Sequence, residues 1–129
     1  GQSGAQIELG NTHYLFVLGE HDQAELLALL QRTEEITQKS MQHFSDLKIA
    51  LVIHGPSVRL FTQDTYPEHR ALVDLAARLD AFGVIDLKIC QTSLKEAGVA
   101  ESDIPAFIDR VPYAPDEIRR LTESGYINL

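Results

Sequence analysis

Cys90 is the one cysteine in this chain of 129 residues, and no other residue is better suited to nucleophilic chemistry. It lies in the stretch LKICQTSLKEAG, residues 87–98, where an apolar run gives way to a polar, helix-like one. Helix N-termini and nearby cations favour the thiolate, which is the form of cysteine that attacks sulfur and carbonyl electrophiles. If the apolar run is a strand and a helix starts directly after it, the free N–H groups of Gln91, Thr92 and Ser93 would face the sulfur.

A buried, unreactive thiol is the competing interpretation of Cys90. Free cysteine is among the residue types most often buried, where it packs as a small hydrophobe. A reactive Cys90 must present its sulfur to solvent at the edge of the sheet, whereas a packing Cys90 would be enclosed by aliphatic neighbours. The sequence leaves both interpretations open.

Two histidines are expected at the same edge of the sheet as the thiol, because each follows an apolar run that is typical of a strand. His54 closes residues 47–54, and His21 follows residues 14–18. The working crevice of a parallel sheet lies beyond the carboxyl ends of its strands, and consecutive strands are often neighbours. His54 is therefore a candidate thiolate partner of Cys90, although a histidine before a Gly-Pro turn can equally serve to satisfy loop carbonyls.

The sequence does not indicate a metal or nucleotide site. His21, His54 and Cys90 are all metal-ligand types, but their separations match no compact zinc or copper motif. Residues 55–57 lack the second glycine and the Lys-Ser/Thr pair of a phosphate loop, and residues 19–22 lack the glycines of a dinucleotide turn. We therefore expect no metal ion and no cofactor.

Charge and composition narrow the range of partners. Eleven basic and nineteen acidic residues give a formal net charge of -8 and a pI near 5.0, which disfavours nucleic acid and anionic lipid as partners. No window approaches the roughly 18 apolar residues of a membrane span.

A single cysteine excludes an internal disulfide but does not fix the compartment. We expect a cytoplasmic protein, or a periplasmic one if a signal peptide preceded Gly1.

Apolar periodicity predicts strands that alternate with helices along the chain. Short β-branched runs predict strands, and apolar residues in steps of three and four predict helices. The predicted strands are residues 14–18, 47–54, 84–90, 110–112 and 126–129. The predicted helices run from Asp22 to 43–45, from Pro67 to 82, from 92 to 97 and from 115 to 125. Helical turns or packed loops are predicted at residues 58–61 and 102–108. This order predicts a parallel sheet covered by helices. We expect residues 13–129 to form one domain, and we expect residues 1–12 to be a flexible segment before it.

From about Thr12 to the C-terminus, the chain resembles the DsrE/DsrF-like family. The likeness rests on four stretches: KIALVIHGPSVRLF (48–61), ICQTSLKEAGV (89–99), DIPAFIDRVPYAP (103–115) and EIRRLTESGYINL (117–129). It implies a three-layer α/β/α domain with a five-stranded, mainly parallel sheet, and a homo-oligomer, commonly a trimer or hexamer.

The resemblance also implies a role for the thiol. In the sulfur-relay members, a cysteine at the position of Cys90 carries a persulfide, receives sulfur from a donor protein and passes it to a small carrier protein. His54 and Gly55 match a recurrent His-Gly turn of the family. Around Cys90 the sequence resembles the stand-alone branch more than the heteromeric relay subunits.

Two functional hypotheses follow from these observations. In the first, the protein is sulfurtransferase-like and Cys90 carries the persulfide, with His54 as the second catalytic candidate. The ligand-binding candidates are then Gly55, Gln91, Thr92, Ser93 and His21. In the second, the protein is a non-catalytic homo-oligomer that binds a small ligand or serves assembly, and Cys90 only packs. The apolar segment at residues 58–61 would be exposed in a lone loop, which favours oligomerisation.

Overall fold

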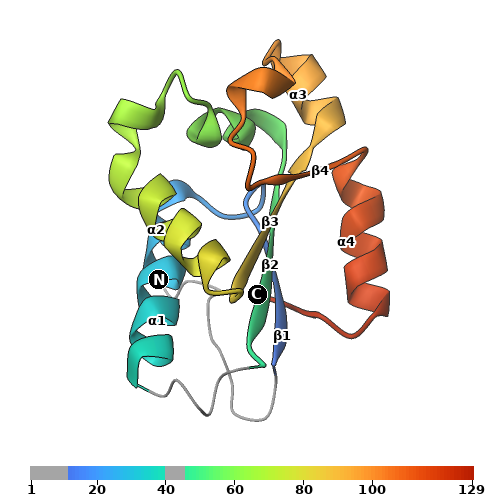
Figure 1. Cartoon of the computed structure of the whole chain (residues 1–129). Coiled ribbons are helices and arrows are strands. Elements are labelled where there is room, and N and C mark those ends of the chain that lie inside the picture. The colour runs from blue at the N-terminus through green and yellow to red at the C-terminus, as the bar shows by residue number, and fades with distance from the viewer. Residues whose placement is uncertain (1–11, 40–45) are drawn as a thin grey trace.

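The computed structural model describes residues 12–39 and 46–129, which form one parallel sheet with helices on both faces (Figure 1). The strands are β1 (His13–Val17), β2 (Lys48–Ile53), β3 (Ile85–Cys90), β4 (Asp109–Val111) and β5 (Ile127–Asn128). They lie in the order β4-β3-β2-β1-β5, and each neighbouring pair is parallel. The predicted α/β/α class, the five-stranded sheet and the adjacency of the second and third strands are confirmed.

The core is divided in two by the sheet, because successive residues of a strand point to opposite faces. From β1, Tyr14 and Phe16 join the larger cluster on the side of α1 and α2, and Leu15 and Val17 join the smaller one under α4. The continuous apolar runs of β1 and β2 arise from this burial on both faces.

The helices cover both faces of the sheet and mostly begin and end where the sequence predicts. They are α1 (Gln23–Lys39), α2 (Arg70–Ala81), α3 (Gln91–Ala97) and α4 (Ala114–Glu123), with short 3₁₀ segments η1 (Gly55–Phe61), η2 (Tyr66–Glu68) and η3 (Glu101–Asp103). Asp22 caps α1 as predicted: its carboxylate accepts the N–H of Glu25 at 2.8 Å, and the Glu25 carboxylate accepts the N–H of Asp22 at 3.1 Å. The predicted end of this helix at residues 43–45 and the predicted flexible segment before Thr12 lie outside the described residues.

One local prediction is wrong: the helix predicted from Pro67 begins at Arg70, because Pro67 belongs to the 3₁₀ segment η2. The helical turn or packed loop predicted at residues 58–61 is part of η1, and it folds onto the chain's own core, where Val58 and Phe61 are buried. This segment therefore does not support oligomerisation.

None of the helices in residues 12–39 and 46–129 has both the length and the apolar character needed to cross a membrane.

Candidate functional site

Cys90 is the last residue of β3 and also the N-cap of α3. Alternation along the strand sends the side chains of Ile85, Leu87 and Ile89 into the larger core cluster. The side chain of Cys90 turns to the opposite face of the sheet, under α4. The prediction that this cysteine closes a strand and precedes a short helix is confirmed.

Backbone amides from two helix N-termini donate hydrogen bonds to the Cys90 sulfur. The N–H of Ser93, in the first turn of α3, lies 3.4 Å from Sγ, and the N–H of Ala114, the first residue of α4, lies 3.3 Å from it. The N-terminus of a helix carries a partial positive charge, and its first amides have no partner within the helix. Both donors therefore favour the anionic form of the sulfur.

The Ser93 hydroxyl adds a third donor and connects the thiol to the neighbouring strand. The N–H of Gly55, just after β2, donates to the Ser93 Oγ at 2.8 Å, and the hydroxyl in turn hydrogen-bonds the Cys90 sulfur. Gly55 has a φ of 65°, a left-handed conformation that glycine adopts without steric cost. The predicted residues Gly55 and Ser93 thus lie at the thiol and act on it directly or through one another.

These contacts decide the acidity of the thiol. Burial of Cys90 acts to raise its pKa, but the hydrogen bonds from the Ser93 hydroxyl and from the amides of Ser93, Ala114 and Thr92 outweigh burial. The pKa of Cys90 is therefore lowered from its ordinary value, so a larger share of the sulfur is thiolate at neutral pH.

The sulfur is not presented to solvent, contrary to what a reactive thiol requires. Cys90 is only 2% exposed and packs in the smaller cluster with Ala114 and Leu121 of α4. The connection from β4 to α4 passes over it, and this cover is fastened by Thr92, whose N–H and hydroxyl both donate to the Pro112 carbonyl, at 3.3 and 2.8 Å. The open thiol that the reactive interpretation requires is not found, because the start of α4 lies over the sulfur, and the burial matches the packing interpretation.

His54 lies at the same edge of the sheet but has no hydrogen bond to the Cys90 sulfur among the described residues. Its imidazole packs against Gly19 at the end of β1, so closely that a Cβ on Gly19 would lie 2.4 Å from its Nε2. A role for His54 as thiolate partner remains a hypothesis.

His21 lies on the far side of β1, near the C-terminus. Its Nδ1 pairs with the Glu25 carboxylate at 3.1 Å, its Nε2 bonds the Leu129 carbonyl at 2.9 Å, and its ring stacks on Phe16. Burial acts to lower the pKa of His21, but these two acceptors and the charges of Glu25 and Glu20 raise it overall. Both ring nitrogens of His21 are thus engaged away from the thiol.

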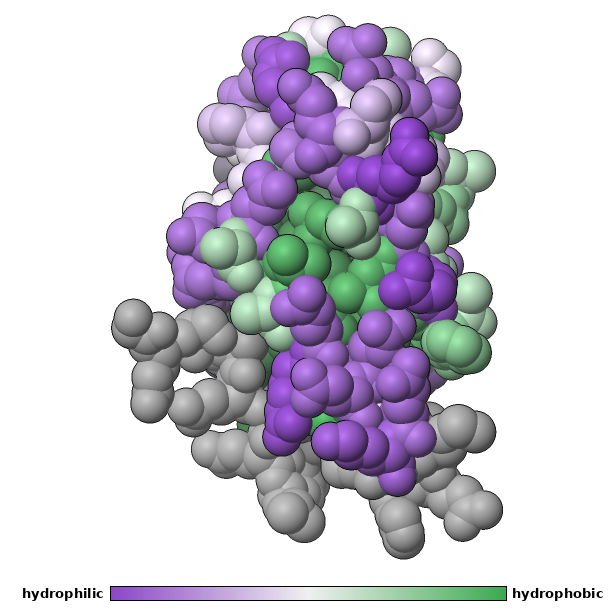
Figure 2. Space-filling view, turned by 90° about the vertical axis from the view of Figure 1, so that its left-hand side faces the viewer, coloured by the Kyte–Doolittle hydropathy of each residue, from purple (hydrophilic) through white to green (hydrophobic). Residues whose placement is uncertain are grey.

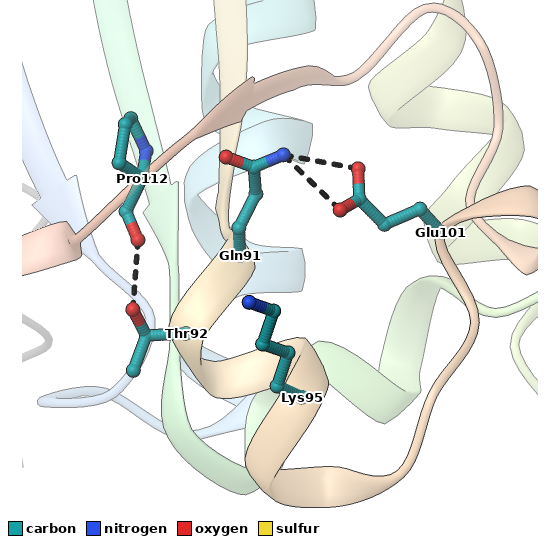
Figure 3. Close-up of a pocket in the computed structure, with 5 residues that line it drawn as sticks. All are labelled: Gln91, Thr92, Lys95, Glu101 and Pro112. Atoms are coloured by element: carbon teal, nitrogen blue, oxygen red, sulfur yellow. Dashed lines mark hydrogen bonds between the residues drawn. The ribbon is translucent and has the colours of Figure 1, made fainter.

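An open pocket of about 320 Å³ lies beside the Thr92–Pro112 contact (Figure 3). Its lining residues are Gln91, Thr92, Lys95, Glu101 and Pro112. The Gln91 amide donates to both oxygens of the Glu101 carboxylate, at 3.1 Å each. The predicted ligand-binding residues Gln91 and Thr92 therefore line a pocket, and Thr92 also belongs to the cover of the thiol.

Some residues of this site were not found from the sequence. Ala114 could have been found, because Pro115 marks a helix start and the first amides of a helix lack partners. Lys95 and Glu101 gave no signal, since a charged residue on a short helix and one in a loop are indistinguishable from solvated surface. Within the described part of the chain, no three His, Cys, Asp or Glu side chains are grouped so that they could hold a metal ion.

Comparison with known proteins gives a family and a fold. The family model described as "DsrE/DsrF-like family" matches residues 16–129. A structure of a protein of unknown function, MTH1491 from Methanobacterium thermoautotrophicum, is 17% identical with a TM-score of 0.67 and covers 92% of this chain and 98% of its own. The ychN protein from E. coli is 12% identical with a TM-score of 0.64 and covers 92% of this chain and 100% of its own. No curated protein matches the chain.

Proposed function

Because the chain belongs to the DsrE/DsrF-like family, we propose that it is a sulfur-transfer protein that carries sulfane sulfur as a persulfide on Cys90. The observation that carries this proposal is the set of donors at the sulfur: the amides of Ser93 and Ala114, from two helix N-termini, with the Ser93 hydroxyl beside them. A cysteine that served only for packing would not need donors that lower its pKa.

The proposed reaction is two successive thiol exchanges. The Cys90 thiolate attacks the outer sulfur of a donor persulfide R–S–SH; the new S–S bond forms on Cys90, the donor S–S bond breaks, and its electron pair leaves with the donor as R–S⁻. Cys90 then holds S–SH. An acceptor thiolate attacks that outer sulfur in the same way and regenerates the Cys90 thiolate, so no net oxidant is needed.

The cover over the sulfur has a part in this proposal. Since Cys90 is 2% exposed, an incoming persulfide reaches it only after the connection that contains Pro112 moves away. That connection is fastened to α3 at a single carbonyl, Pro112 O, by the two donors of Thr92, and Pro112 itself is exposed. Opening therefore requires the loss of these two bonds and of the Ala114 N–H bond to the sulfur.

Incubation with a persulfide donor tests the proposal directly. We expect the intact protein to gain about 32 Da on Cys90, and we expect Cys90→Ser to gain nothing. Thr92→Val, which removes the hydroxyl bond to Pro112 while keeping the shape of the side chain, should speed the gain. An unmodified Cys90 after exposure to excess donor would reject the proposal.

A non-catalytic assembly or small-ligand-binding protein is the second candidate, favoured by the burial of Cys90. The face of α1 and α2 also carries a gathering of hydrophobic surface at its centre, with hydrophilic surface above and below (Figure 2). For this candidate, the thiol would react with an alkylating agent only in unfolded protein.

For both candidates we propose a homo-oligomer, a trimer or a hexamer, and for the first also a sulfur donor and a sulfur acceptor protein. Sedimentation equilibrium at micromolar concentration tests the assembly, because the monomer has a mass of 14.4 kDa. A single species of that mass would reject the oligomer. Sulfur transfer would then still be tested by the mass gained on Cys90 after incubation with a persulfide donor.

A further inference from the structure

The pocket beside α3 holds one charge of each sign. Lys95 contributes an ammonium group from α3, and Glu101 contributes a carboxylate from the start of η3. Lys95 points into the space between the Thr92–Pro112 pair and the Gln91–Glu101 pair (Figure 3). The pocket is therefore polar at both sides and open to solvent.

The two charges do not neutralise each other. No ion pair joins Lys95 to Glu101, and the Lys95 ammonium has no hydrogen-bond partner in the described part of the chain. Glu101 is held by the neutral Gln91 amide, at 3.1 Å to each oxygen, and by Arg110, whose Nε lies 4.0 Å from Oε1. An oriented carboxylate and an unpaired ammonium at one pocket match a small ligand that carries both charges.

The pocket also shares a wall with the cover of the thiol. The Thr92–Pro112 contact lines the pocket, and the amide of Thr92 also helps to lower the pKa of Cys90. Two residues after Pro112, the Ala114 N–H donates to the Cys90 sulfur. The pocket and the cover of the sulfur thus share two residues, Thr92 and Pro112.

We infer that this pocket binds the amino-acid part of a low-molecular-weight persulfide, such as cysteine persulfide, which serves as sulfur donor; this inference rests on the proposed sulfur transfer. The donor's carboxylate pairs with Lys95, its α-ammonium pairs with Glu101, and its sulfur lies toward the Thr92–Pro112 wall. The volume of about 320 Å³ is at the lower end of small-molecule sites, which suits a ligand of this size.

Binding is measured first, with a ligand that cannot transfer sulfur. S-methyl-L-cysteine is titrated into the isotope-labelled protein and the shifts of the amides around α3 are followed. We expect Lys95→Gln and Glu101→Gln each to weaken binding by about tenfold, the effect of one charge-assisted contact. The matched controls Lys39→Gln and Glu96→Gln, exposed charges outside the pocket, should bind as the wild type does.

A second measurement compares two donors by the mass gained on Cys90. Cysteine persulfide carries both charges of an amino acid, and inorganic polysulfide carries neither an ammonium nor a carboxylate. We expect Lys95→Gln and Glu101→Gln to slow transfer from cysteine persulfide by about tenfold and to leave transfer from polysulfide unchanged.

The outcomes separate this inference from the proposed function. Transfer from both donors at rates that the two pocket variants leave unchanged would overturn the pocket assignment and leave sulfur transfer standing. Binding of S-methyl-L-cysteine through Lys95 and Glu101, with no sulfur gained from either donor, would overturn sulfur transfer and leave an amino-acid site. A wild type that shows no shift with S-methyl-L-cysteine would also overturn the pocket assignment.

Discussion

At the scale of single residues, the acidity of Cys90 depends on donors that the sequence places close by. Ser93 is the central one, because its amide and its hydroxyl both bond the sulfur while the hydroxyl accepts the N–H of Gly55. Hydrogen bonds to an anion are stronger than those between neutral groups, so the hydroxyl stabilises the thiolate more than the thiol. Its removal therefore shifts the balance toward the neutral form.

We predict that Ser93→Ala raises the pKa of Cys90 and slows its alkylation at neutral pH. The substitution also leaves the Gly55 N–H without its acceptor, which costs about 1–3 kcal/mol of stability if no water replaces it. Alkylation rate against pH and urea unfolding measure the two effects. Ser102→Ala, on an exposed residue of η3, is the control and should change neither; an unchanged pH profile for Ser93→Ala would show that the hydroxyl does not act on the sulfur.

The lowered pKa of Cys90 also predicts how stability depends on pH. The folded state stabilises the thiolate more than the unfolded state does, so this contribution is fully present above the ordinary pKa of a thiol and is lost as pH falls through the lowered folded pKa. The stability of the wild type relative to Cys90→Ser should therefore rise with pH below about 8.5, the ordinary thiol pKa, and level off above it. A difference in the free energy of unfolding that stays flat as pH rises to that value would contradict the lowered pKa.

At the scale of elements, the end of β1 and the end of β2 fit together through Gly19 and His54. A Cβ on Gly19 would lie 2.4 Å from the His54 Nε2, closer than side chains approach, so the ring must move aside in Gly19→Ala. We expect a loss of about 1–2 kcal/mol, of the size of a displaced rotamer with its packing. The loss should largely vanish in the His54→Ala background, which removes the ring. A loss of the same size in both backgrounds would mean that Gly19 is needed for its backbone alone.

Arg110 of β4 holds the backbone of the loop that carries Glu101. Its guanidinium donates to the carbonyls of Glu101, Ile104, Pro105 and Ile108, at 2.9, 2.9, 3.0 and 2.6 Å. A planar group with five donors can serve four carbonyls at once, whereas the single ammonium of lysine cannot.

We therefore predict that Arg110→Lys loosens residues 101–108 while the sheet stays intact. The amides of Ile104 and Ile108, which bond within this loop, should exchange with deuterium several-fold faster, and global stability should fall by about 1–3 kcal/mol. Arg119→Lys, on an exposed helix position, is the matched control. Equal exchange in Arg110→Lys and the wild type would show that the loop is held by its own packing.

The elements themselves were largely predictable from the sequence, and the covering of the thiol was not. The apolar run of β2 and the apolar steps of α2 are local patterns, and each became the expected element. That Cys90 ends a strand is equally local. Its burial depends on where α4 crosses the sheet, a contact between residues 24 positions apart in the chain, from Ala114 to Cys90. No periodicity predicts such a contact, so the sequence could not decide between an open and a buried thiol.

At the scale of the whole molecule, the last residues of the chain form β5, the strand at one edge of the sheet. The order β4-β3-β2-β1-β5 requires α4 to carry the chain from one edge of the sheet across β2 and β1 to the other. β5 pairs with β1 over two positions, and the Leu129 N–H bonds the Leu15 carbonyl at 2.8 Å. With so short a ladder, the C-terminal edge depends on additional contacts.

His21 supplies such a contact, and its protonation should control this edge. Burial acts to lower the pKa of His21, but its bonds to the Leu129 carbonyl and Glu25 outweigh burial and raise the pKa overall. A raised folded pKa means that the stabilisation is fully present below the unfolded value and is lost as pH rises through the folded value. The pairing of the C-terminal strand should therefore be most stable in mildly acidic solution and less stable at higher pH.

His21→Phe tests this prediction, because it keeps an aromatic ring to stack on Phe16 and removes both polar bonds. As pH rises above about 6.5, the ordinary pKa of histidine, the wild type should lose stability relative to this variant, and its Leu129 amide should exchange faster after correction for intrinsic exchange. His69→Gln, at the N-cap of α2, should keep the wild-type dependence. If His21→Phe shows the same pH dependence as the wild type, the neutral imidazole holds Leu129 as well as the charged one does, and the C-terminal strand is not controlled by pH.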